Sequence, residues 1–123
     1  LEGSTTAGTY TFSTNQCLYT KIGRQVSVMG NLQVDTASGG VGLAIFGGLP
    51  FAKANNSIFT GAVRTSGVDV DNSTMNLSTS STTSGASSEF GIVSTKDNAT
   101  SVFLGIAGIS TGDIIFFSFT YFV

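Results

Sequence analysis

Apolar and polar residues alternate without interruption in one segment of this chain, which reads Gln25-Val26-Ser27-Val28-Met29-Gly30-Asn31-Leu32-Gln33-Val34-Asp35. Successive side chains of a β-strand point to opposite faces of its sheet. The pattern therefore predicts a strand that turns one set of alternate residues toward a core and the other set toward a wetter surface. The core-facing set is Val26, Val28, Gly30, Leu32 and Val34.

The sequence on either side of this segment extends the same prediction. Residues Leu18 to Ile22 also alternate, and Gly23-Arg24 forms a short turn between the two runs, so we expect a β-hairpin. No segment has a sustained apolar period of 3.6 residues, and we therefore expect no long helix. Further short strands are predicted at Tyr10–Ser13, Val41–Phe46, Ser57–Val63, Val68–Val70, Met75–Leu77, Phe90–Ser94, Ser101–Ile106 and Asp113–Val123.

Composition favours the same fold class. Hydrophobic residues make up 41% of the 123 residues, with 10 Phe and no Trp, and charged residues make up only 10%. An average globular domain carries about 25% charged residues, and strands and turns prefer the β-branched, aromatic, Gly and Asn residues that replace them here. We predict one all-β domain over residues 1–123, an antiparallel β-sandwich with a jelly-roll-like arrangement of about eight strands.

The last predicted strand is apolar on both faces. One face carries Ile115, Phe117, Phe119, Tyr121 and Val123, and the other carries Ile114, Phe116 and Phe122. A central strand covered on both sides by its own chain is one explanation. A two-layer sandwich has one inner face per sheet, however, so we favour a second face that packs against a neighbouring subunit.

The residue inventory argues against catalysis. The chain has no His and one Cys, so Ser-His-Asp and Cys-His sites are excluded and no cofactor is predicted. The densest acidic position is Asp69-Val70-Asp71-Asn72, where two carboxylates fall on one side of a strand. They are an incomplete ligand set for Ca²⁺, and we favour a solvated strand end leading into a turn.

Charge and hydropathy restrict the partners. The formal net charge is −2 and the five basic residues are scattered along the sequence. The sequence therefore predicts no clustered basic surface for binding nucleic acid. No run of 18 apolar residues is present, so membrane insertion is not predicted. Cys17 lies among strand residues and is expected to be a buried, inert thiol.

Four features follow one another along the chain: Leu1-Glu2-Gly3, the hairpin from Tyr19 to Gly30, Gly48-Leu49-Pro50-Phe51 and the apolar final strand. In this order they resemble the C-terminal β-domains of phage tail fibres, tailspikes and related virion structural proteins. The Trp-Thr-Pro that often follows the opening motif in that family is replaced by Ser4-Thr5-Thr6. The matching residues belong to packing and turn positions, so the resemblance supplies no receptor and no binding residue.

The resemblance implies a trimeric, non-enzymatic module at the surface of the phage particle. The leading expectation is a tail fibre or spike domain for host attachment, the C-terminal module of a longer virion protein. Its partners would be two further copies, other virion proteins and a host surface glycan or protein. A capsid decoration (cement) protein and a carbohydrate-binding module are the alternatives. Loops on a rigid scaffold often carry recognition, and the candidates here are Asn55, Asn56, Asp71 and Asn72.

Overall fold

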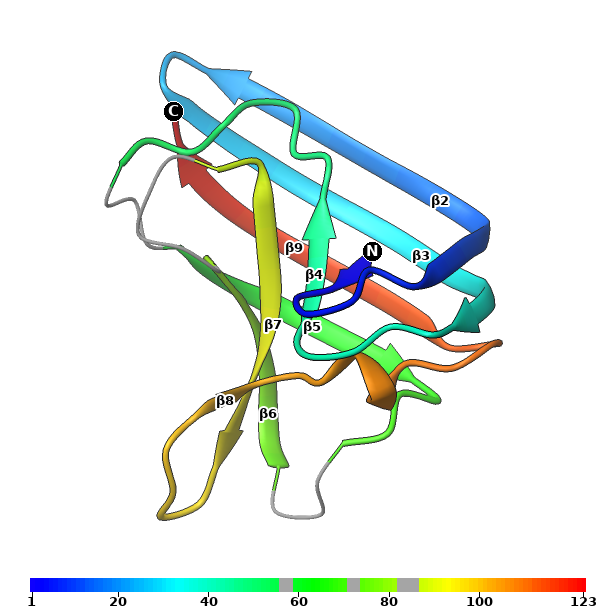
Figure 1. Cartoon of the computed structure of the whole chain (residues 1–123). Coiled ribbons are helices and arrows are strands. Elements are labelled where there is room, and N and C mark those ends of the chain that lie inside the picture. Colours follow the sequence, from blue (N-terminus) through cyan, green and yellow to red (C-terminus); the bar gives the residue numbers. More distant parts are fainter. Residues whose placement is uncertain (56–58, 71–73, 82–86) are drawn as a thin grey trace.

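The computed structural model describes residues 1–55, 59–70, 74–81 and 87–123, and it is all-β apart from one short 3₁₀-helix (Figure 1). Three of the predicted recognition residues, Asn56, Asp71 and Asn72, lie outside these ranges. The elements within the ranges are β1 (Glu2–Gly3), β2 (Thr9–Ile22), β3 (Gln25–Ser38), β4 (Ala44–Gly47), β5 (Thr60–Ser66), β6 (Thr74–Ser80), β7 (Glu89–Lys96), β8 (Val102–Phe103), the 3₁₀-helix η1 (Ile106–Gly108) and β9 (Ile114–Phe122).

All described strand pairs are antiparallel and belong to one curled sheet. The strand order is β1-β4-β7-β6-β5-β9-β3-β2, with β8 paired to β7. In Figure 1, β5, β9, β3 and β2 form one layer and β4, β7, β6 and β8 form the other. The all-β antiparallel prediction is confirmed, and the two layers are parts of a single nearly closed barrel. Its seam lies between the two end strands, β1 and β2.

The predicted hairpin forms with longer arms than expected. Strands β2 and β3 pair from Ile22 opposite Gln25 as far as Thr9 opposite Ser38. Gly23 has a φ of 59°, the left-handed conformation that a two-residue hairpin turn requires. The register shifts on either side of Phe12, which marks a bulge near the start of β2.

Several strand predictions were wrong in extent. The strand expected at Val41–Phe46 begins only at Ala44, because Gly42 has a φ of 98° that interrupts an extended chain. Residues Val68–Val70 lie in no described strand. The segment Ser101–Ile106 divides between β8 and η1. Within the described ranges, no helix is long and apolar enough to cross a membrane.

The inner face of β9 supplies the centre of the core. Its predicted core-facing residues Ile115, Phe117, Phe119 and Tyr121 are all at most 6% exposed. Phe90, from the opposite layer, lies 5.0 Å from Phe117 and 4.9 Å from Phe119 between ring centroids, and Phe59 stacks on Phe119 at 4.8 Å. This ring cluster joins the two layers, and each buried ring removes about 150–250 Å² from water.

Gly30 makes room for the ring cluster. It pairs with Phe117 across β3 and β9, and a Cβ atom added at Gly30 would collide with the Phe117 ring. The absence of a side chain at this core-facing position therefore lets the aromatic ring lie over the β3 backbone.

We predict that Gly30→Ala lowers the free energy of unfolding by about 1–3 kcal/mol, because Phe117 must move out of its packed position. Gly47→Ala is the matched control, since its Cβ would meet nothing within 4 Å. Urea denaturation measures both. Combining Gly30→Ala with Phe117→Leu should be less destabilising than the sum of the single changes by at least about 0.5 kcal/mol. Strict additivity would contradict the proposed contact.

Candidate functional site

The layer formed by β5, β9, β3 and β2 has an outer face, which points away from β4 and β7 (Figure 1). The register fixes its composition, because directly opposed residues in paired strands point to the same face. Four residues form one row across the strands, in the order Gln16, Asn31, Phe116 and Arg64. The next row consists of Leu18, Met29, Ser118 and Ala62.

The three predicted interface residues all lie on this outer face. Phe122 is 52% exposed, and Ile114 and Phe116 are half-buried. The guanidinium of the exposed residue Arg64 lies 5.5 Å from the centre of the Phe116 ring. This cation partly shields the ring from solvent. In Figure 1, no described element lies over this face. Within the described part of the chain, β9 is therefore not a central strand covered on both sides.

An apolar groove of about 530 Å³ crosses the outer face. Phe116 and Met29 line it, and the small residues Ser118 and Ala62, in the row next to Phe116, deepen it. The Oδ1 atom of Asn31, which also lines the groove, is buried without a hydrogen-bond partner in the described part of the chain. An unsatisfied buried acceptor is costly, and what the groove itself exposes is mainly apolar area.

Sequence reasoning missed two prominent residues of this surface. Leu18 is 69% exposed and Met29 is 57% exposed. The signal was present, since Met29 falls on the wetter side of the β3 alternation and Leu18 is paired directly opposite it. The interface prediction used the last strand alone, whereas the exposed apolar surface continues across β3 onto β2.

The second half of strand β2 is exposed to solvent. Every residue from Asn15 to Ile22 is exposed, on both faces of the strand, and Ile22 reaches 77%. Phe51, in the loop after β4, contacts the inner side of this part of the strand. Its ring meets Tyr19 edge-on at 5.7 Å and lies 5.3 Å below the Lys21 ammonium. Tyr121 anchors that loop, since its hydroxyl donates to the Phe51 carbonyl at 2.9 Å.

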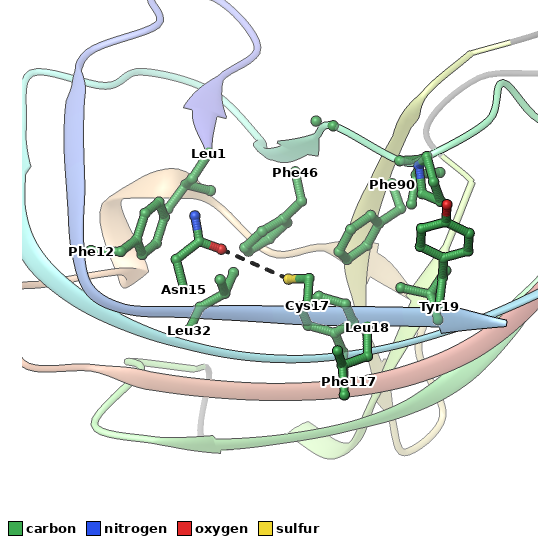
Figure 2. Close-up of a pocket in the computed structure, with 15 residues that line it drawn as sticks. Leu1, Phe12, Asn15, Cys17, Leu18, Tyr19, Leu32, Phe46, Phe90 and Phe117 are labelled. Carbon is green, nitrogen blue, oxygen red and sulfur yellow. Dashed lines mark hydrogen bonds between the residues drawn. The ribbon is translucent and has the colours of Figure 1, made fainter.

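On the inner side of β2 lies a cavity of about 330 Å³, shown in Figure 2. Asn15, Cys17 and Tyr19 project from β2 toward it, and Phe46 and Phe90 lie across from them. The cavity occupies the seam of the barrel, between the edge strand β2 and the strand β4 with its following loop. None of its lining residues carries a charged side chain.

The buried thiol predicted at Cys17 is wrong. Cys17 is exposed, because β2 is an edge strand whose inner face overlooks the seam cavity and not the packed core. Its Sγ lies 3.8 Å from Asn15 Oδ1. Partial desolvation on the cavity side raises the pKa of the Cys17 thiol above its ordinary value.

The remaining predicted site residues do not form a site in the described ranges. Asn55 lies in an exposed turn. Asp69 is exposed and its backbone N–H donates to Gly108, while its predicted companion Asp71 falls outside these ranges. No group of three His, Cys, Asp or Glu side chains suited to a metal ion occurs among the residues with a described position. Lys53, one of the five scattered basic residues, is 1% exposed.

The chain was compared with protein-family models, with curated proteins and with solved structures, and none of them matches it. The likeness to phage virion domains therefore stays a resemblance of short motifs. What the described surface offers is apolar contact area bordered by amide and hydroxyl groups, which is the usual chemistry of contact between proteins.

The raised pKa of Cys17 gives a direct test of its position. A higher pKa leaves a smaller thiolate fraction at pH 8, and the thiolate is the reactive form. We predict that iodoacetamide alkylates Cys17 more slowly in the folded chain than in urea, with the midpoint of the rate–pH profile shifted upward. Mass spectrometry follows the reaction. An equal or lower midpoint in the folded chain would contradict a thiol desolvated by the cavity.

Proposed function

We propose that this domain is a non-enzymatic assembly module that self-associates into a homotrimer through the outer face of the β5-β9-β3-β2 layer. The observation that carries the proposal is the apolar groove between Phe116 and Met29, together with exposed Leu18 and Phe122 on the same face. Contiguous apolar surface of this kind marks protein contact sites in soluble proteins.

The chemistry of the outer face suits a partner with the same surface. Its rows alternate bulky apolar side chains with small ones, so that a ridge such as Phe116 has a recess beside it at Ala62 and Ser118. In a trimer with closed rotational symmetry the contact is head-to-tail, so a ridge of one copy meets a different part of the next copy's outer face, such as this recess.

For the biological setting, we propose a trimeric tail fibre or spike domain for host attachment at the surface of a phage particle. The support is the motif resemblance, the low charge of the chain and the exposed apolar face, which an assembled particle would cover. Host contact would then fall to loops such as that containing Asn55, which is exposed. Antibody labelling of intact particles would distinguish a fibre from the alternative, a capsid decoration protein.

We predict that light scattering of the purified chain gives three times the monomer mass at micromolar concentration. Phe116→Asp places a charge in the groove and should yield monomers that keep a β-sheet circular dichroism spectrum. Met29→Asp is a second variant at a 57% exposed position, where the cost to the single subunit is small.

The matched control is Val102→Asp, because Val102 is exposed and lies on β8 in the opposite layer. This variant should remain trimeric. A monomeric wild-type chain, or variants at Phe116 and Met29 that assemble as the wild type does, would contradict the proposal.

A further inference from the structure

The second surface that lacks a partner is the seam of the barrel. Strand β2 pairs with β3 along one edge, and no described strand pairs with its other edge. That edge belongs to a strand of 14 residues, and from Thr14 to Ile22 its register is continuous. A row of unpaired backbone N–H and C=O groups of this length is a template for another strand.

The free edge has none of the usual protection over its central part. Natural edge strands are kept from pairing by charged side chains, by proline, by bulges or by being short. Between Thr9 and Ile22 the single charged residue is Lys21, there is no Pro, and the bulge lies at the far end, around Phe12. The sequence therefore leaves residues 14–18 open to backbone pairing, ahead of Tyr19 and Lys21, whose side chains contact the Phe51 loop.

The seam cavity is adjacent to this edge and matches it chemically. Cys17 and Asn15 point from β2 into the cavity, so a strand added beside β2 would direct its alternate residues the same way (Figure 2). The aromatic rings of Phe46 and Phe90 line the cavity, and its volume of about 330 Å³ is at the small end for ligand sites. It suits one or two apolar side chains.

We propose that the seam is a second binding site, which receives an extended, uncharged polypeptide segment by strand addition to β2, with apolar residues at every second position. The backbone of the incoming segment hydrogen-bonds to the free β2 edge, and its apolar side chains enter the cavity. The absence of charged side chains from the cavity lining disfavours a charged side chain at these positions, because little there would compensate its desolvation. Self-association through the outer face is a separate property of the other side of the layer.

The probe is an acetylated, amidated octapeptide in which leucine and threonine alternate, titrated into the intact chain. The readout is amide hydrogen exchange resolved by NMR for each residue. At a peptide concentration of ten times Kd, we expect exchange of the edge amides between Asn15 and Leu18 to slow by about tenfold. A peptide of the same composition with its leucines grouped together cannot present one apolar face, and it should give no protection.

Two variants of β2 carry the same added charge on opposite faces. Cys17→Lys places an ammonium in the cavity and should abolish peptide binding, whereas Thr20→Lys lies on the outer face and should preserve it. Cys17→Ser keeps a small side chain and should also bind.

Three results would overturn the proposal. One is the absence of peptide-induced protection in β2. Another is binding that shifts Phe46 and Phe90 resonances without protecting β2 amides, which would indicate a site for small apolar molecules. The third is full protection of the edge amides before peptide is added, which would mean that a neighbouring copy already covers β2. Light scattering is independent of the first two results, so the seam site can fail while the trimer stands, and the Phe116 and Met29 variants test the trimer at the other face.

Discussion

The packing of Phe117 and Phe119 against Phe90, over the bare backbone of Gly30, determines which side of β9 is inside. Once these rings occupy the core, strand geometry turns Phe116 and Phe122 outward, because neighbouring residues of a strand point to opposite faces. The exposed apolar surface is thus a direct consequence of the core. Three large apolar side chains of β9, Ile114, Phe116 and Phe122, therefore lie half-buried or exposed on the outer face.

Strand β2 connects the two unpartnered surfaces. Its outward residues, such as Leu18, continue the groove across the sheet, and its inward residues, such as Cys17, border the seam cavity. The first half of the strand packs Tyr10 and Phe12 against the core, and the second half pairs with β3 and contacts the Phe51 loop. A hairpin arm with this much exposed surface, including Ile22 at 77% exposure, is the element of the fold best placed to bind partners.

Much of the fold could be predicted from the sequence, because local alternation defines a strand and its buried face. The inward residues of β9 and of the segment from Val26 to Val34 follow directly from that pattern. The position of β2 at the sheet edge could not be predicted in this way, since strand order depends on pairing between residues far apart in the chain. For the same reason the exposure of Cys17 and the burial of Lys53 were missed.

The central claim is that the outer face is covered when the protein is assembled. Hydroxyl-radical footprinting with mass spectrometry measures this directly at Met29, whose side chain is 57% exposed in the single chain. The account predicts that Met29 oxidation slows severalfold as the concentration rises through the assembly transition, while oxidation of Val102 on the opposite layer stays constant. Equal oxidation of Met29 in the dilute and the concentrated protein would contradict it.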